Sequence, residues 1–323
     1  MYLAPEGHEI EIANAAADFL ADAMPIDRLH SANSADMNAA LRQHFGEMGW
    51  FALAVPESQG GSGLSVVEHV LFFREVGRQC GPVDVLAQGL AANAIGDAGL
   101  RQEIIAGTQG VALLAPDGDR YRLIGNPEAG LALLVTPDRA QLFSLAEIRA
   151  MARPALDPAN SMGVLGILPA PVTTMDSSHI WRLGQLGVAA MLVGIAEASL
   201  DLIVDYAKVR ETFGRKIGSW QAVRHPCADM AVRAEAARAQ LWYAAAAIKE
   251  GRSDADVHLD AAKHLANQAA LMNADANIQL HGGIGVADEH NAHLLLKHAM
   301  LLSRLFGTKR SLLGRLLNAR LED

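Results

Sequence analysis

Polar and glycine residues in the last third of the chain could bind a phosphate-bearing cofactor. Arg210 lies in the run YAKVRETFGRKIGSWQAV, residues 206–223. Its guanidinium fork can hold two phosphate oxygens, although a solvated arginine that ends a helix fits the same position. In the run QLHGGIGVADEH, Gln279 precedes Gly282 and Gly283. Such glycines can end a helix, and because they lack Cβ they also let the backbone approach a ligand.

Other chemistries find less support in the sequence. Four histidines are close together, but none forms an HExxH motif and no cysteine or carboxylate pair completes a ligand shell: His281, His290, His293 and His298. We therefore expect no metal site. There is no G-x-S-x-G elbow and no P-loop. Cys80 and Cys227 match no metal or redox spacing, so we expect buried, reduced thiols.

The elements that must position these residues follow the order helices, strands, helices. From about residue 9 to 105 the apolar pattern is helical, with a loop at VPESQGGSGLS, residues 55–65. Between Val111 and Thr174, prolines and glycines separate short apolar runs, which is typical of a small β domain.

The last part of the chain is helical again. Apolar residues at helical spacing follow from about residue 180, and we expect further helices over 221–250, from Asp254 to just before Gly282, and over 288–305. The amphipathic run SLLGRLLNARL closes the chain. We predict a mainly α fold with an N-terminal α-helical domain at 1–108, a reduced β domain at 109–176 and a C-terminal four-helix bundle at 177–323.

The net charge and the apolar pattern of the chain exclude some classes of binding partner. The 323 residues carry a net charge of −9, which argues against a nucleic-acid-binding domain but not against an anionic ligand held by a few arginines. No uninterrupted apolar run approaches the ~18 residues of a membrane span. The start, MYLAPEGHEIEIA, has acids where a signal peptide needs positive charge. We expect a cytoplasmic protein.

Taken together, the two runs of the last third and Gly307-Thr308 resemble the acyl-CoA dehydrogenase family. The loop at residues 55–65 is also similar to the N-terminal helical domain of that family. The resemblance implies that Arg210 crosses a subunit interface to the pyrophosphate of FAD. It implies further FAD contacts from positions that match the family: Thr212, Phe213, Gln221, Gln279, Gly282, Gly283 and Thr308.

The same resemblance predicts a catalytic base that this chain lacks. The family removes a proton beside the thioester of an acyl-CoA with a glutamate, while the flavin takes a hydride. In most members the glutamate directly precedes the Gly-Thr pair, where this chain has Phe306. Other members place it on the first bundle helix, ten residues before the glycine that here is Gly194, and that position is Gly184. We expect no catalytic residue.

The middle of the chain departs from the family as well. The T-E-P-x-x-G-S-D-like and W-x-[ST] segments that contact the flavin ring are missing between Val111 and Thr174. The chain therefore resembles the shortened subunit of α2β2 complexes, which would share FAD with a full-length paralogue and act on an acyl-CoA of a fatty acid or steroid side chain. The alternatives are an active homo-oligomer with a relocated base, which would pass electrons to an electron-transfer flavoprotein, and a flavin-free scaffold.

Overall fold

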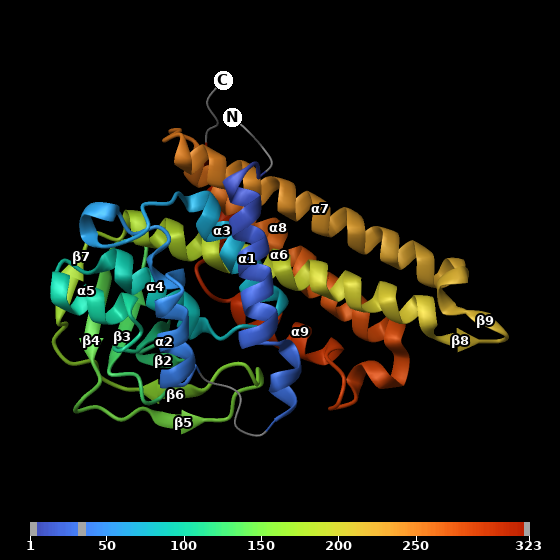
Figure 1. The fold of residues 1–323 in the computed structure, drawn as a ribbon, viewed down its shortest axis with the longest axis horizontal. Coiled ribbons are helices and arrows are strands. Elements are labelled where there is room, and N and C mark those ends of the chain that lie inside the picture. Colours follow the sequence, from blue (N-terminus) through green and yellow to red (C-terminus); the bar gives the residue numbers. More distant parts are fainter. Residues whose placement is uncertain (1–4, 32–36, 320–323) are drawn as a thin grey trace.

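The computed structural model describes residues 5–31 and 37–319. Helices form the first third of the chain, a small mixed sheet the middle, and long helices the rest (Figure 1). The predicted fold class is thereby confirmed. One large apolar core runs through all three parts, since it contains Phe72 from the first, Leu133 from the second and Leu192 from the third, and a smaller cluster lies within the β part. The domain bounds at 108 and 176 stay a prediction.

Five helices and three short 3₁₀ turns make the N-terminal part. The helices are α1 (His8–Ala23), α2 (Ala39–Glu47), α3 (Val66–Arg78), α4 (Val83–Ala94) and α5 (Ala98–Ile105); the turns are η1 (Ile26–His30), η2 (Trp50–Ala52) and η3 (Glu57–Gln59). Helix α3 begins with a capping box in which Ser65 and Glu68 satisfy free backbone amides of the first turn. The glycine-rich loop ends at this cap, as its composition predicts.

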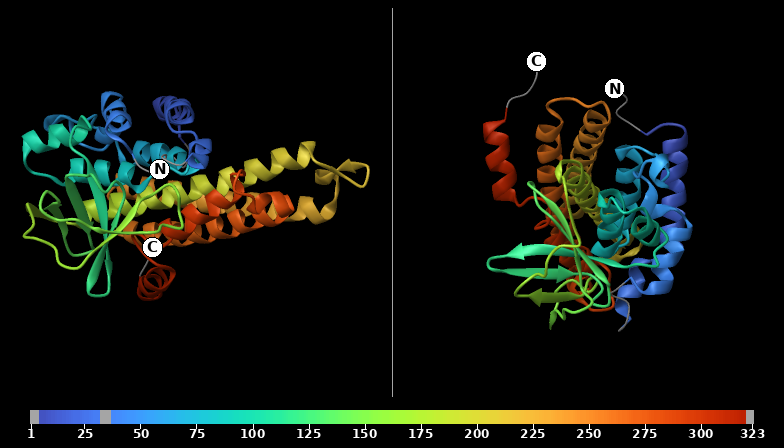
Figure 2. Two further views of the ribbon diagram at one scale, coloured as in Figure 1. Left: turned by 90° about the horizontal axis from the view of Figure 1, so that it is seen from below. Right: turned by 90° about the vertical axis from the view of Figure 1, so that its left-hand side faces the viewer.

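Small residues let α3 lie directly on the first bundle helix. A Cβ added to Gly77 would come within 2.0 Å of the Met191 carbonyl oxygen, and one added to Gly194 within 2.0 Å of the Arg74 carbonyl oxygen. Beside this contact, Arg74 Nε donates to a Glu197 carboxylate oxygen at 2.7 Å. The close approach fixes the N-terminal helices against one side of the bundle (Figure 2).

Seven strands form the sheet, in the order β5-β6-β2-β1-β3-β4-β7. They are β1 (Val111–Asp117), β2 (Arg120–Ile124), β3 (Leu131–Val135), β4 (Ala140–Ser144), β5 (Met151–Arg153), β6 (Met162–Leu165) and β7 (Thr173–Met175). Strand β1 pairs with β2 antiparallel and with β3 parallel. Only Gly118 and Asp119 join β1 to β2, so the chain turns back at once where the family is expected to carry a flavin-contacting segment.

The bundle consists of four helices and a closing helix. They are α6 (Ser178–Val209), α7 (Gln221–Lys249), α8 (Ala255–His281), α9 (Ala292–Leu302) and α10 (Lys309–Asn318). The hairpin β8 (Glu211–Thr212) and β9 (Arg215–Lys216), with η4 (Ile217–Ser219), joins α6 to α7, and η5 (Gly282–Val286) follows α8. The half of the bundle that ends in this hairpin extends beyond the N-terminal helices and the sheet (Figures 1 and 2).

Helix α6 forms the centre of this arrangement. It is long and apolar enough to cross a membrane by length and composition, but 72% of its most apolar window is buried inside the fold. Such burial identifies it as the core helix of a bundle. A cytoplasmic location stays a prediction.

Two expectations from the sequence need correction. The fourth bundle helix covers Ala292–Leu302 rather than residues 288–305, because the residues before it form turns and α9 ends at Leu302. Cys80 is buried as predicted, but Cys227 is only half-buried, since it lies in the exposed first turns of α7. The closing run is helical to Asn318, and its residues 320–323 lie outside the described part.

Candidate cofactor-binding end and the Phe306 cavity

Seven of the eight predicted cofactor residues lie at the free end of the bundle, which we call the distal end. Arg210 ends α6, Thr212 and Phe213 belong to the following hairpin, and Gln221 begins α7. Three more lie where α8 passes into η5: Gln279, Gly282 and Gly283. Ring contacts join these two groups, because Tyr206 of α6 lies 4.5 Å from His281 of α8, between ring centroids.

The distal end offers open, unpaired groups. Among the described residues, the Arg210 guanidinium has no hydrogen-bond or ion-pair partner, while its backbone carbonyl accepts from Ile217 N–H. Phe213 is 94% exposed and has a φ of 51°. No atom lies within 4 Å of a Cβ added to Gly282 or Gly283. These features fit a phosphate and a planar group brought from outside the chain.

Thr308, the eighth predicted residue, lies elsewhere. It is the N-cap of α10, where its side chain accepts from Ser311 N–H. Gly184 on α6 lies against Phe306, two residues before Thr308, and Arg210 follows Gly184 by twenty-six residues. At a rise of 1.5 Å per residue, α6 places these two positions roughly 40 Å apart. The predicted cofactor residues therefore form two separate groups within one chain.

The region of Thr308 contains a cavity of about 290 Å³, which we call the Phe306 cavity. It is lined by the end of β1, the start of α6 and the segment Arg304–Thr308. Among its described lining residues there is no aspartate, glutamate, histidine or tyrosine. Its volume lies at the lower limit of pockets for small ligands, about 300–1,000 Å³. No lining group offers a base for proton abstraction.

The two positions where the family carries its base lie against each other at this cavity, through the Phe306 ring of its wall. The Phe306 ring is 7% exposed, and a Cβ added to Gly184 would lie 2.2 Å from its Cε1 atom. Trp181 lies on the other side, with its ring centroid 5.3 Å from that of Phe306. Phe306 therefore fills the space that a side chain at position 184 would need. Trp181 was missed from the sequence, although it lies one helical turn before Gly184.

A matched pair of glycine substitutions tests this contact. We expect Gly184→Ala to destabilise the fold by about 1–3 kcal/mol, because the new methyl group overlaps the Phe306 ring. Gly314→Ala on α10 meets no atom within 4 Å and should instead stabilise by about 0.5–1 kcal/mol. Urea unfolding of both variants gives these values.

The double variant Gly184→Ala/Phe306→Ala completes a thermodynamic cycle. The cost of Gly184→Ala should vanish once the ring is removed. An unchanged cost in the Phe306→Ala background would mean that the two positions do not touch.

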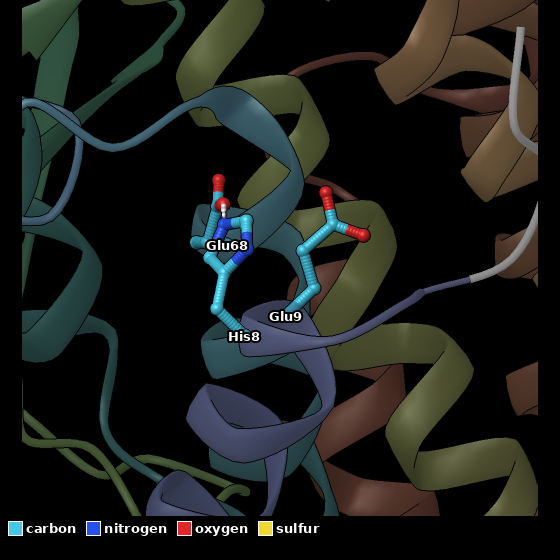
Figure 3. Close-up of side chains that lie close together, drawn as sticks. All are labelled: His8, Glu9 and Glu68. Carbon is cyan, nitrogen blue, oxygen red and sulfur yellow. Dashed lines mark hydrogen bonds and ion pairs between the residues drawn. The ribbon is translucent and has the colours of Figure 1, made fainter.

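One cluster of possible metal ligands was not predicted from the sequence. His8, Glu9 and Glu68 bring their ligand atoms within 4.8 Å of one another (Figure 3). Glu68, at 2% exposure, already accepts from Ser65 N–H and from His8 Nε2 at 3.0 Å. Glu9 faces Lys249 Nζ at 3.3 Å. Glu68 is explained by the capping box of α3, and the helix dipoles at the N-terminal turns of α1 and α3 disfavour a cation.

Comparisons with known proteins agree with this arrangement. The family model described as acyl-CoA dehydrogenase, N-terminal domain, matches residues 6–103, and that described as acyl-CoA dehydrogenase, C-terminal domain, matches residues 181–320. The acyl-CoA dehydrogenase IpdE2 of Mycobacterium tuberculosis is 32% identical over 276 residues, which cover 84% of this chain and 83% of IpdE2. FadE34 of the same organism is 33% identical over 273 residues, which cover 78% of this chain but only 38% of FadE34.

Solved structures share the fold over nearly the whole chain. The ChsE4–ChsE5 complex of Mycobacterium tuberculosis has a chain with a TM-score of 0.81 at 23% identity, covering 98% of both chains. The steroid ACAD Tcur3481–Tcur3483 gives 0.81 at 23% identity, covering 96% of this chain and 97% of that one. Both family models together match most of the sequence. The chain belongs to the acyl-CoA dehydrogenase family.

Proposed function

We propose that this chain is the non-catalytic subunit of a heteromeric acyl-CoA dehydrogenase. In this proposal a full-length paralogue provides most of an FAD site, and the distal end of this chain completes it. The paralogue dehydrogenates the acyl-CoA. Members of the family are FAD-binding flavoproteins. The observation that carries the proposal is the contact between the Phe306 ring and Gly184. These two residues occupy both positions where the family usually has its base, and neither can accept a proton.

The separation of the two groups along α6 supports FAD sharing. Arg210, with no partner among the described residues, lies roughly 40 Å along the helix from the Phe306 cavity. A group so far away cannot bind a cofactor whose reactive ring sits in that cavity of the same chain. Bound FAD would supply the hydride acceptor, and Arg210, Gln279 and the Gly282–Gly283 backbone would hold its phosphates and adenosine.

The two alternatives lose support in different ways. An active homo-oligomer needs a relocated base, and the lining of the Phe306 cavity contains none. It also needs a segment that supports the flavin ring. At the place where the family is expected to carry that segment, only two residues join β1 to β2. A flavin-free scaffold does not explain an arginine without a partner among the described residues, or two open glycines, at the distal end. The name of one structural relative, the steroid ACAD Tcur3481–Tcur3483, favours an acyl-CoA with a steroid-type acyl group.

Arg210→Ala tests the proposed role of the distal end. In the complex assembled with a full-length paralogue, we expect this change to lower the FAD content by about tenfold or more, since a charge-assisted pair contributes ~1.5–3 kcal/mol. The unfolding midpoint should stay unchanged, because exposed charges contribute little to stability. Flavin absorbance per complex after gel filtration measures the effect.

Lys208→Ala is the matched control. This change also removes one positive charge from the distal end. In the wild type the Lys208 ammonium pairs with the Asp205 carboxylate at 2.8 Å. Its FAD content should equal that of the wild type. Equal flavin content in the Arg210 variant and the wild type would show that Arg210 does not bind the cofactor.

A further inference from the structure

Four histidines surround the turn that joins α8 to α9. His281 ends α8 and His293 lies in the first turn of α9, and their side chains are buried, at 5% and 9% exposure. His290 is half-buried, with its ring centroid 4.5 Å from that of His281. His30 of η1 is close enough to lower the pKa of both His290 and His293. Tyr206 of α6 packs on the His281 ring. We call the four histidines the histidine cluster.

The hydrogen bonds of His281 and His290 favour neutral rings. His281 Nδ1 donates to the Asn277 carbonyl oxygen at 2.8 Å, so Nε2 is the nitrogen without a proton in the neutral ring. This Nε2 atom is buried and has no partner within the described part of the chain. His290 Nδ1 accepts from the N–H of Ala292, the first amide of α9, at 3.1 Å. A protonated His290 could not accept this bond, because both ring nitrogens of a histidinium are donors.

Protonation of the cluster would bury positive charges close together. Burial is the largest cause that lowers the pKa of three of the rings: His281, His290 and His293. The neighbouring histidines lower the pKa of His290 further, and Lys297 lowers that of His293. Asp288 acts in the opposite direction on His293, but the pKa of His293 stays below its ordinary value. The dipole of α9 also disfavours a cation at its first turn.

Asn291 joins the same turn to η1. Its Nδ2 donates to Asp27 Oδ1 at 2.6 Å, and its Oδ1 accepts from His30 Nε2 at 2.6 Å. The Asp27 carboxylate is thus linked to His30 through the amide. Among the residues that the structure describes, no carboxylate forms an ion pair with the other three rings of the cluster. A proton added to one of these rings would have no counter-charge in contact.

We propose that the distal turn, residues 281–291, is a pH-sensitive switch. It stays closed while His281 and His290 are neutral, and it opens when they become protonated. Gln279 and the pair Gly282–Gly283 lie beside or within this turn, so its opening would also displace groups that are proposed to hold FAD. This consequence rests on the proposed function, whereas the opening itself does not.

The direction of the switch follows from the lowered pKa of these histidines. In an opened turn their rings have the ordinary pKa of ~6.5. Between this value and the lower native pKa, the closed turn binds fewer protons than the opened turn, so its stability falls as the pH drops below about 6.5. Above about pH 6.5 the rings are neutral in both forms, and the closed turn keeps its full stability.

Amide hydrogen exchange of the isolated chain at pH 7.5 and pH 5.0 tests the opening without any cofactor. After correction for the intrinsic exchange rate, we expect the protection of residues 282–293 to fall by about tenfold or more at the lower pH, since each unit of lowered pKa amounts to a factor of ten. The centre of α6, around Leu192, should stay more protected than the turn at both pH values, which distinguishes local opening from global unfolding. Equal protection of the turn at both pH values would overturn the proposal.

Two histidine substitutions supply a matched pair. His290→Asn removes the titrating ring but keeps an acceptor for Ala292 N–H, because an asparagine side chain can accept from the backbone two residues on. Its loss of protection between the two pH values should be at least about fivefold smaller than that of the wild type. His225→Asn changes an exposed histidine in the first turns of α7 and should lose protection as the wild type does. An equal loss in both variants would overturn the proposal.

The complex with a full-length paralogue tests the consequence for the cofactor. At pH 5.0 we expect the wild-type complex to lose FAD on gel filtration and the His290→Asn complex to retain it. Full retention by the wild type, although its turn opens, would overturn the link between the turn and the cofactor. A complex without FAD at pH 7.5 would contradict the proposed function but would leave the exchange result intact.

Discussion

Acyl-CoA is expected to bleach no flavin when it is added anaerobically to the unaccompanied wild-type chain with FAD, or to its Phe306→Glu variant. The variant restores a carboxylate at the usual position of the base, but the cavity it faces is lined without flavin-ring support. A lost general base costs ~100-fold to 10,000-fold in rate, whereas a reaction without its hydride acceptor does not proceed. The missing hydride acceptor therefore decides the outcome, even where a base is restored.

Three proteins make this experiment specific. Phe306→Gln matches the size of the new side chain without its basicity, and far-UV circular dichroism checks that both variants fold. The substrates are medium-chain and steroid-type acyl-CoAs. Bleaching by the wild type would contradict the non-catalytic role. Bleaching by Phe306→Glu but not by Phe306→Gln would show an intact flavin site that lacks only its base.

Asp157→Asn is expected to destabilise the fold by about 3 kcal/mol, because it removes a buried carboxylate that accepts several hydrogen bonds. The Asp157 carboxylate accepts from His298 Nδ1 at 2.8 Å and from Asn160 Nδ2 at 2.7 Å, and His298 is fully buried. Asn160 in turn accepts from Val83 N–H at 2.8 Å. This network joins the loop before β6 to α9 and α4, so its loss should loosen all three parts together.

An exposed pair provides the comparison. Asp117→Asn removes the partner of Arg122, which is half-exposed, and should cost about 0–1 kcal/mol. Urea unfolding of both variants at neutral pH measures the difference. A cost for Asp157→Asn no larger than that for Asp117→Asn would mean that the buried network contributes little.

The same substitution predicts a change in pH dependence. Burial alone would raise the pKa of Asp157, but the charge of His298 and the hydrogen bonds from His298, Ala159 and Asn160 hold it below its usual value. A carboxyl with a depressed pKa stabilises the fold above about pH 4, its value in the unfolded chain, and loses this contribution as pH falls through the lower native pKa. The wild type should therefore lose stability more steeply below pH 4 than Asp157→Asn.

The sequence predicted the helices well where capping residues marked their ends. Helix α8 begins beside Asp254 and ends before Gly282, and α3 begins at the Ser65 capping box. The expected start of α9 was wrong because apolar periodicity does not register the polar turn before Ala292. The short runs of the middle third predicted strands, but the parallel pairing of β1 with β3 depends on contacts that no local pattern specifies.

The residues of the candidate sites could also be predicted only in part from the sequence. Motifs of the family predicted Arg210, Gln279 and the paired glycines, and the structure brings them to one end of the bundle. The contact between Gly184 and Phe306 joins residues far apart in the chain, so each could be named from the sequence but not their packing. The histidines of the distal turn could likewise be named from the sequence, but not the hydrogen bonds that favour their neutral rings.

If this chain completes an FAD site with a full-length subunit, it should hold no flavin by itself. The most direct measurement is flavin absorbance per chain after gel filtration, for the protein purified alone and after co-expression with a full-length paralogue. We expect a colourless chain alone and a yellow complex that contains both subunits. Stoichiometric FAD on the unaccompanied chain, or a flavin-free complex after co-expression, would contradict it.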